Sequence, residues 1–443
     1  MRRLLLLAVC LLNGVAWAGG EARVSRVVEG LRSGGILVDV QEKCLDGEMR
    51  WVEADVYDRK SEHPITVNVL AMRRTGIRRV IYLLTTSSLN YRGSFFTPAE
   101  KGLAYYLASR GYLVVGITPR EDNVASEDDM SVMADWGMRQ HRDDVRTIIK
   151  RVQKQVGLPY DVLGHSFGAI VALDYAGRYS DNDFERVMVL DVPSFDPDAQ
   201  PDMIAKAQLS LDAYDTLLGT GNYVETSLFD LRLLLMANAA FPDADSGVPR
   251  PFVEYGLEGN FTFAGLLHFS LIYSSALPGV ISPLTGLPQE WPMVLGNAAG
   301  YYAPAVYPAD DVFGLTHVDV NRLLAVAGVM GSGYAPVALA RDYTSAIADQ
   351  KLYSVDWAGI DEKVVWVNAQ LGMGGQTHGA TLIEAAGNED VQVHVIPGYG
   401  HADVILGENA AEDVWGLLLP QPDSWESQYQ WWQYWQGYSA YRP

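Results

Sequence analysis

Residues 160–179 read YDVLGHSFGAIVALDYAGRY, and this stretch decides the fold. The apolar residues that precede Gly164 predict a short strand, and the alanine-rich run from Phe167 to Tyr179 predicts a helix. The five residues at 164–168, GHSFG, match the pattern G-x-S-x-G. Three fixed letters can arise by chance, but a strand that enters the pattern and a helix that leaves it supply the sharp turn that the pattern requires.

The turn gives Ser166 its expected role as a nucleophile. Glycine at 164 and 168 keeps side chains out of a turn that is too tight to hold them and permits strained backbone angles. Ser166 then stands above the edge of the sheet, with a helix N-terminus beneath it that favours negative charge. The alternative is a tight turn whose serine has no function.

A serine hydroxyl is a poor nucleophile without a base. His401 is the first candidate, because it follows the last predicted strand in VIPGYGHAD at 395–403 and so lies at the same sheet edge as Ser166. His378, in a glycine-rich loop, is the second candidate. The remaining six histidines lie in the turn, in a strand, outside the expected loops or in an insertion: His165, His394, His63, His141, His268 and His317.

Strands and helices alternate on both sides of the turn. Continuous apolar strands that alternate with helices indicate a parallel sheet covered on both faces, which is an α/β fold. Helices are predicted over 99–110, 139–156, 167–179 and 410–419. Strands are predicted as a hairpin within 35–58 and over 63–72, 79–86, 112–117, 161–163, 186–192, 363–368 and 391–396.

The order of strand, GHSFG turn, insertion, strand and GYGHAD loop resembles the α/β-hydrolase superfamily, in its capped, lipase- and esterase-like form. The resemblance covers the core on both sides of the insertion. It implies a mostly parallel sheet of about eight strands with helices on both faces. It also implies a large, mainly helical cap after the strand that follows the nucleophile helix, and a triad in the order serine, acid, histidine.

The acid departs from the commonest pattern of this superfamily. Most relatives carry it just after the penultimate strand, but no Asp or Glu occurs between Lys363 and Ile383. A subset carries it at the end of the strand after the nucleophile helix, where this chain has Asp191, 25 residues beyond Ser166. Asp191 is therefore the expected acid. Asp196 and Glu384 remain alternatives, in which case Asp191 merely ends a strand.

The oxyanion hole needs two backbone N–H groups aimed at the oxygen of the tetrahedral intermediate. The resemblance implies that one belongs to Phe167, the residue after the nucleophile. The second is expected in the loop LLTTSSLNYRG at 83–93, from Thr86 or Ser87. Relatives usually have His-Gly in this loop, and the missing glycine leaves the geometry of the hole open.

The first 18 residues, MRRLLLLAVCLLNGVAWA, have the form of a cleavable signal peptide. Two arginines precede a short apolar run, and Ala16-Trp17-Ala18 gives the small residues of a cleavage site. We therefore expect a secreted or periplasmic protein. The run is too short to anchor the chain in a bilayer.

Composition excludes several classes of protein. The 443 residues carry a net charge of −21, so a phosphate-binding surface and a nucleic-acid partner are not expected. With 49% hydrophobic and 20% charged residues the chain is not disordered as a whole. Two cysteines cannot form a disulfide scaffold or a four-ligand zinc site.

The predicted organisation has five parts. They are a signal peptide at 1–18, the first part of the core at 19–195, a cap or lid at 196–355, the second part of the core at 356–420, and an aromatic-rich tail at 421–443. Within the cap, positions 259–309 carry a single charged residue, Glu290. This stretch either closes an apolar pocket over the serine or forms the core of the cap itself. Its apolar run is interrupted by polar residues and proline, so no stable membrane span is expected.

These features predict a secreted serine hydrolase that cleaves a carboxylic ester, with an apolar acyl or aromatic group, through an acyl-enzyme. Ser166, His401 and Asp191 would form the triad. No cofactor or metal is expected, and the partner would be a small-molecule or lipid-like ester. A serine peptidase or amidase on the same fold, and a non-catalytic binding protein of that fold, are the alternatives. The oligomeric state stays open.

Overall fold

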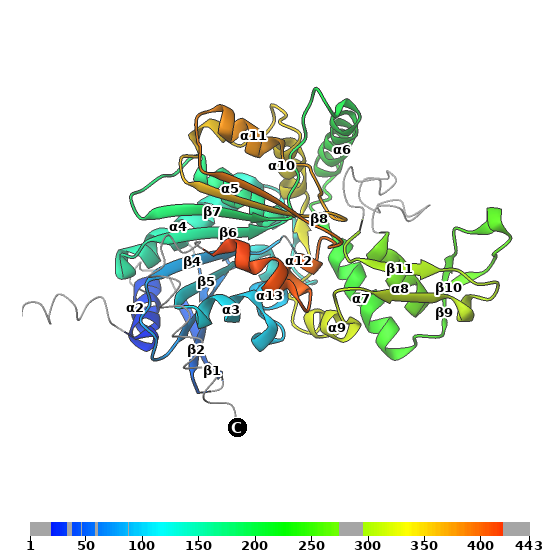
Figure 1. Ribbon diagram of the computed structural model, residues 1–443, viewed down its shortest axis with the longest axis horizontal. Helices are drawn as coiled ribbons and strands as arrows, with labels where there is room; N and C mark the ends of the chain where they lie inside the picture. Colours follow the sequence, from blue (N-terminus) through cyan, green and yellow to red (C-terminus); the bar gives the residue numbers. More distant parts are fainter. Residues whose placement is uncertain are drawn as a thin grey trace, which may run out of the picture.

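A nine-stranded sheet forms the centre of the computed structural model (Figure 1). The model describes residues 19–32, 38–45, 47–57, 61–86, 88–273 and 296–419. The strands lie in the order β1-β2-β3-β5-β4-β6-β7-β14-β15. Their bounds are β1 Val38–Leu45, β2 Met49–Val56, β3 Ile65–Met72, β4 Arg79–Leu84, β5 Tyr112–Thr118, β6 Tyr160–His165, β7 Phe184–Leu190, β14 Lys363–Ala369 and β15 Val391–Ile396.

The type of strand pairing changes once across the sheet, from antiparallel to parallel at β5. β1, β2, β3 and β5 pair antiparallel, and every pair from β5 to β15 is parallel. The α/β class and the mostly parallel sheet are thus confirmed. The sheet has one strand more than the eight or so that the resemblance implied, because the predicted hairpin adds β1 at the edge. The carboxyl ends of the parallel strands meet at one edge, which is where α/β folds place their sites.

The sheet is buried on both faces, as its apolar strands predict. Alternate residues of β4 show this: Val80, Tyr82 and Leu84 join one hydrophobic core, and Ile81 and Leu83 join the other. The period of two follows from the pleat, which points successive side chains to opposite faces.

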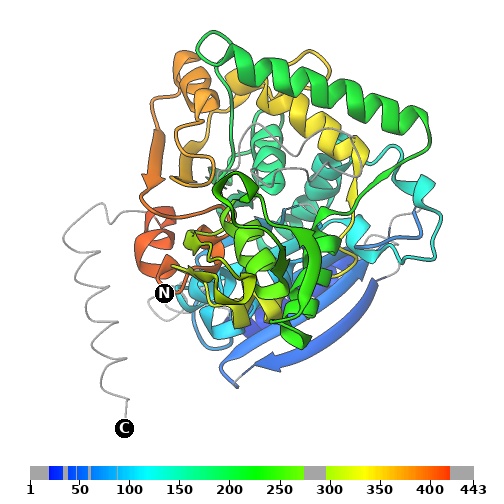
Figure 2. The same cartoon turned by 90° about the vertical axis from the view of Figure 1, so that its right-hand side faces the viewer.

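Different helices cover the two faces. One face carries α2 Gly20–Arg32, α4 Met138–Val156 and α5 Phe167–Ala176, with α10 Val337–Ile347 packed on α4 and α5. The other carries α3 Leu103–Ser109, which packs on β3 and β5, and α12 Asp403–Leu406, which contacts β14. In Figure 2 the long helix α6 Pro201–Gly219 runs beside α10, in agreement with their many contacts.

Helix α2 was not predicted from the sequence. Its apolar residues Val24, Val27, Val28 and Leu31 are all buried, and their spacing is that of one helix face. Arg23 donates a hydrogen bond to the carbonyl oxygen of Val156 at 3.0 Å and so joins α2 to the end of α4.

The helix predicted at 410–419 is divided in the structure, into α13 Ala410–Asp413 and a 3₁₀ turn at Trp415–Leu418.

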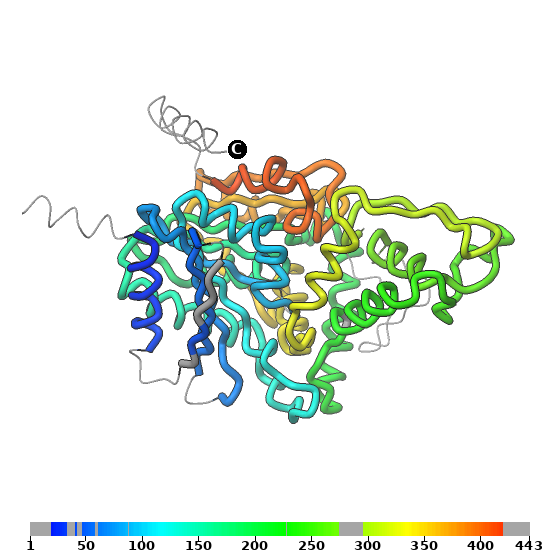
Figure 3. The backbone as a smooth tube through the Cα atoms, turned by 90° about the horizontal axis from the view of Figure 1, so that it is seen from below, coloured from blue at the N-terminus to red at the C-terminus, as the bar shows by residue number. Residues whose placement is uncertain are grey.

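The insertion between β7 and β14 contains most of the remaining helices that the structure describes. These are α6, α7 Ser227–Ala240, α8 Phe263–Ile272, α9 Val320–Ala327 and α10. Three two-stranded sheets accompany them: β8 Val224–Glu225 with β13 Ala335–Pro336, β9 Asp245–Pro249 with β10 Asn260–Thr262, and β11 Gly300–Ala303 with β12 Val312–Leu315. The described residues from α7 to β12, 227–273 and 296–315, form a lobe that projects beyond the sheet (Figure 3).

The apolar run at 261–282 only partly falls within the described residues. Phe261, Phe269, Phe252 and Tyr302 pack against one another inside the lobe, with ring centroids 5.1 to 6.4 Å apart. These rings therefore form a local core. Among the residues that the structure describes, no helix has the length and apolar character to cross a membrane.

Candidate active site

Ser166 lies at the junction of β6 and α5 with a strained backbone. β6 ends at His165 and α5 begins at Phe167, so a single residue makes the turn. The angles of Ser166 are φ 56° and ψ −121°, which residues other than glycine rarely adopt. Such strain costs on the order of 1–3 kcal/mol and persists only where the surroundings enforce it. The structure thus has the sharp turn that the sequence predicts. Ser166 is largely buried, with 6% of its surface exposed.

Both flanking glycines are required by close backbone contacts. A Cβ atom on Gly164 would lie 2.1 Å from the carbonyl oxygen of Gly168, and one on Gly168 would lie 2.4 Å from the carbonyl oxygens of Leu84 and Thr85. The second contact brings the start of α5 against the end of β4. Gly168, the residue after Phe167, therefore lies against the backbone of Leu84 and Thr85.

Replacement of Gly168 by alanine tests this packing. We expect Gly168→Ala to lower the free energy of unfolding by about 3 kcal/mol or more, because backbone atoms at 2.4 Å cannot move aside as a flexible side chain can. The matched control is Gly219→Ala at the end of α6, where a Cβ meets nothing within 4 Å. Denaturant unfolding monitored by circular dichroism measures both. Equal stability of the two variants would contradict the account of the turn.

His401 and Asp191 are in direct contact. Nδ1 of His401 donates to Oδ2 of Asp191 across 2.6 Å, and the carboxylate is fully buried. Asp191 follows the last residue of β7, and His401 lies in the loop after β15. With Nδ1 bound to the carboxylate, Nε2 is the ring nitrogen left to take a proton. This is the arrangement by which an acid orients a histidine base.

The loop after β14 holds the Asp191 carboxylate from the other side. Oδ1 accepts hydrogen bonds from the backbone N–H groups of Ala369 at 2.6 Å and Met373 at 3.1 Å. Asp191 has a φ of 46°, a second strained residue in the site. Asn368 is fully buried and accepts from the N–H of Val192 at 3.1 Å, which fixes the chain just beyond the acid. The position after the penultimate strand thus supplies hydrogen-bond donors to the acid.

The alternative site residues lie elsewhere. Asp196 accepts from the N–H groups of Asp198 and Ala199, and its nearest histidine is His378, 3.7 Å away. Glu384 is exposed on α11 His378–Ala385. Among the described contacts neither carboxylate reaches His401. The structure therefore brings the first-choice acid and base together and pairs the second-choice base with a different acid.

The insertion is bonded to the His401 loop. The N–H of His401 donates to the carbonyl oxygen of Gly296 at 3.1 Å, and the N–H of Ala299 donates to buried Asp403 at 2.8 Å. A Cβ on Gly400 would lie 2.8 Å from the backbone of Ala298, so the two segments touch closely. The sequence motif GHAD contained Asp403, but its role as a link to the insertion was not predicted.

Two features of the expected active site are not fully formed: the hydrogen bond from Ser166 to the base, and the oxyanion hole. Among the described residues no hydrogen bond joins the hydroxyl of Ser166 to His401. Such contacts are often long in unliganded enzymes and shorten when substrate binds. Thr86 is 8% exposed at the end of β4 and its carbonyl accepts from the N–H of Leu89 at 3.4 Å. Ser87, the other expected donor, lies outside the described residues.

Comparison with solved structures returns a provisionally assigned lipase from Sulfolobus solfataricus. It is 18% identical, has a TM-score of 0.59, and the match covers 89% of this chain and 99% of that chain. The chain has the α/β-hydrolase fold. The resemblance stated from the GHSFG turn and the GYGHAD loop is thus confirmed at the level of fold.

Two further solved structures are similar at lower scores. A thermostable carboxyl esterase from Bacillus coagulans is 12% identical, with a TM-score of 0.44 and 79% and 91% of the two chains covered. An alpha/beta hydrolase fold protein from Nakamurella multipartita is 12% identical, with a TM-score of 0.35 and 80% and 95% covered. No family model and no curated protein matches the sequence.

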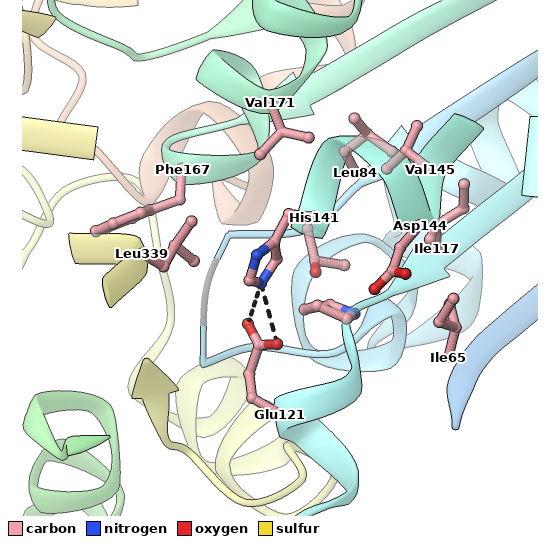
Figure 4. A pocket seen from close by; sticks show the side chains of 13 residues that line it. Ile65, Leu84, Ile117, Glu121, His141, Asp144, Val145, Phe167, Val171 and Leu339 are labelled. Carbon is pink, nitrogen blue, oxygen red and sulfur yellow. Dashed lines mark hydrogen bonds and ion pairs between the residues drawn. The ribbon is translucent and has the colours of Figure 1, made fainter. Parts of the chain in front are cut away.

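A small cavity lies beside the nucleophile turn of this α/β-hydrolase fold (Figure 4). Its volume is about 30 Å³, enough for one or two water molecules. Apolar side chains from the sheet, α4, α5 and α10 line most of it, together with Thr85, Phe167 and a buried ion pair of Glu121 with His141. Its lining includes Phe167 and Gly168 of the turn but neither Ser166 nor His401.

The ion pair at this cavity holds His141 in its charged form. Burial by itself disfavours the imidazolium, but the carboxylate of Glu121 at 3.0 Å and the carbonyl oxygen of Gly137 at 2.9 Å outweigh it. Together they raise the pKa of His141 to about 9. The hydroxyl of Ser332, in the insertion, donates to the backbone carbonyl oxygen of Glu121 at 2.8 Å. This hydrogen bond joins the insertion to the core beside the ion pair. No sequence motif links Glu121, His141 and Ser332.

The raised pKa of His141 predicts a pH-dependent stability. The stabilisation is complete below the unfolded value of about 6.5 and is lost as pH rises through about 9. We expect the free energy of unfolding to fall by on the order of 3 kcal/mol over this interval. The double variant Glu121→Gln/His141→Gln removes the titration, and subtracting its pH profile from that of the wild type removes the contributions of other groups. Identical profiles would refute the assignment.

No group of three or more His, Cys, Asp or Glu side chains that could hold a metal ion occurs among the described residues. The groups with chemistry at the candidate site are Ser166, His401, Asp191 and the neighbouring backbone N–H groups. Sequence reasoning missed the roles of Asp403, Asn368 and the carbonyl oxygen of Gly296. Asn368 and Gly296 belong to no motif, and Asp403 ends the GYGHAD loop without a role that the motif implies; only the folded chain shows what each of them contacts.

Proposed function

We propose that the protein is a secreted serine hydrolase that cleaves carboxylic esters. The observation that carries the proposal is the 2.6 Å hydrogen bond from His401 to fully buried Asp191, at the same sheet edge as strained Ser166. A histidine oriented by a buried carboxylate is a general base, and a serine at a strand-to-helix turn is its usual partner. The α/β-hydrolase fold supplies the framework that joins them.

The reaction follows from these positions. Nε2 of His401 takes the proton of Ser166 as the serine oxygen attacks the ester carbonyl, and Asp191 stabilises the imidazolium that forms. The backbone N–H of Phe167 and that of Thr86 or Ser87 stabilise the oxyanion. His401 then protonates the leaving alcohol. In the second half of the reaction His401 takes a proton from water, which attacks the acyl-enzyme. His401 then returns the proton to Ser166, and the carboxylic acid product leaves.

An apolar ester is the proposed substrate class. Large apolar side chains of the projecting lobe are exposed, among them Phe241, Val253, Tyr255, Val306 and Tyr307. The stretch at 259–309 contributes only Glu290 as a charged residue, so carboxylates that would hold a substrate amine are scarce there. The neighbour from Sulfolobus solfataricus, provisionally assigned as a lipase, makes esters the first class to test.

Labelling with a fluorophosphonate tests the nucleophile. We expect the wild-type protein to bind one phosphonyl group per chain and Ser166→Ala to bind none, because the probe reacts with serines activated by a base. Intact-mass spectrometry measures the increase. Ser88→Ala is the matched control, since Ser88 is a second buried serine in a strained backbone. Failure of the wild type to react would exclude the enzyme and favour a non-catalytic binding protein of this fold.

The acid is tested by Asp191→Asn. We expect kcat for a p-nitrophenyl ester to fall about 10³- to 10⁴-fold with the fold unchanged, because an amide cannot stabilise the imidazolium and favours the wrong tautomer. The control Asp196→Asn alters a carboxylate near His378 and should retain more than half of the wild-type kcat. Near-full turnover by Asp191→Asn would remove Asp191 from the triad.

The scissile bond is tested with matched substrates. A p-nitrophenyl ester and a p-nitroanilide of the same acyl group differ only in the atom that leaves. We expect the ester to be cleaved with the higher kcat/KM and longer acyl chains to be preferred over acetyl. Faster cleavage of the anilide would favour the amidase alternative.

A further inference from the structure

We propose that His165 is a positioning residue for the base: its imidazole donates a hydrogen bond to the backbone carbonyl of His401 and so holds the loop of the base to the end of β6. The proposal rests on the function proposed above and adds a residue that the triad does not contain. His165 immediately precedes the nucleophile, in the variable position of the G-x-S-x-G pattern. Any residue is allowed there by the turn itself, so its identity carries separate information.

His165 is packed directly against His401. Its side chain is buried, with 3% of the residue exposed, and its Nε2 lies 3.0 Å from the carbonyl oxygen of His401. The two rings lie 4.6 Å apart between centroids and are tilted by 31°. The two residues are 236 positions apart in the sequence, so this contact joins the nucleophile turn to the loop of the base.

The hydrogen bond determines which nitrogen of His165 carries the proton. A carbonyl oxygen only accepts, so Nε2 must be the donor. Burial lowers the pKa of His165 well below 6.5, and the neighbouring His401 lowers it further. The ring is therefore neutral at pH 7, with a bare Nδ1. Consistent with this, Nδ1 is buried and has no hydrogen-bond partner in the described part of the chain.

With this contact, both backbone polar groups of His401 have a hydrogen-bond partner. Its N–H donates to the carbonyl oxygen of Gly296 in the insertion, and its carbonyl oxygen accepts from His165 in the core. Both backbone groups of the base are thus engaged from opposite sides. The side chain is then fixed separately by Asp191. Loss of either backbone contact would let the imidazole move relative to Ser166 and lower the population of reactive geometry.

A neutral ring is also suited to this position during the reaction. His401 becomes an imidazolium when it takes the proton of Ser166, and a second cation at a ring distance of 4.6 Å would oppose that step. The neutral imidazole of His165 does not. It donates to the backbone of the base without competing for the proton.

Two substitutions separate the hydrogen bond from the packing. His165→Phe keeps an aromatic ring but removes the donor, and His165→Gln restores an N–H group near the position of Nε2. We expect His165→Phe to lower kcat about tenfold with KM changed less than twofold, which corresponds to one hydrogen bond of ordinary strength. His165→Gln should recover kcat to within about threefold of the wild type.

The matched control is His63→Phe. His63 also contacts a backbone carbonyl through its ring, with Nδ1 3.3 Å from the oxygen of Asn123, and it packs edge-on against Trp136. None of its described contacts is with Ser166, Asp191 or His401, so its replacement should leave kcat and KM within twofold of the wild type. If His165→Phe behaves as His63→Phe does, or if His165→Gln is no better than His165→Phe, the positioning role is wrong.

Nitrogen NMR of histidine-labelled protein tests the tautomer without any assay of activity. The ¹⁵N shifts of His165 should report a neutral ring protonated on Nε2 throughout pH 6–9. A proton on Nδ1, or titration near pH 6.5, would overturn the proposal even if the protein is a hydrolase. Conversely, a wild type that does not react with a fluorophosphonate refutes the proposed function, and the NMR result still decides whether His165 donates to His401.

Discussion

The hydrogen bond between His401 and Asp191 is the contact on which the rest of the site depends. It joins the end of β7 to the loop after β15 and spans 210 positions of sequence. It can form only if β7, β14 and β15 are neighbours in this order, with their carboxyl ends at one edge. The buried carboxylate is satisfied by the N–H groups of Ala369 and Met373 as well as by His401. A buried carboxylate without such partners would destabilise the fold by several kcal/mol.

The insertion is part of the framework that holds the site. Gly296 and Ala299 contact the loop of the base, and Ser332 contacts the loop after β5 that carries Glu121. Asn90, in the loop after β4, donates to the carbonyl oxygen of Val329 at 2.8 Å. The insertion is thus bonded to the loops on both sides of Ser166. Movement of the insertion would therefore change the position of the base.

The sequence predicted the parts of the structure that depend on local pattern. Apolar runs predicted the strands of the main sheet, and the GHSFG turn predicted Ser166 together with its two glycines. Helix α2 was not predicted, although its apolar residues Val24, Val27, Val28 and Leu31 have the spacing of one helix face. Asp191 was predicted only through a family resemblance, because an aspartate that ends a strand carries no signal of its own.

Contacts between distant segments could not be predicted. The bond of His165 to the backbone of His401, the ion pair of Glu121 with His141 and the contact of Asp403 with the insertion each join segments that no motif links. The pairing of His378 with Asp196 likewise needed the fold, since both had been alternatives for the site at Ser166. Side-chain type indicated which residues were able to react, and the topology selected those that meet.

The most direct test of the account is a pre-steady-state measurement of ester cleavage. Rapid mixing with a p-nitrophenyl ester should release one equivalent of p-nitrophenol per chain in a burst, followed by slower turnover as water removes the acyl group. Rapid acid quenching and peptide mass spectrometry should find that acyl group on Ser166. Turnover without any acylated residue, or an acyl group on another side chain, would contradict the claim that Ser166 is the nucleophile activated by His401 and Asp191.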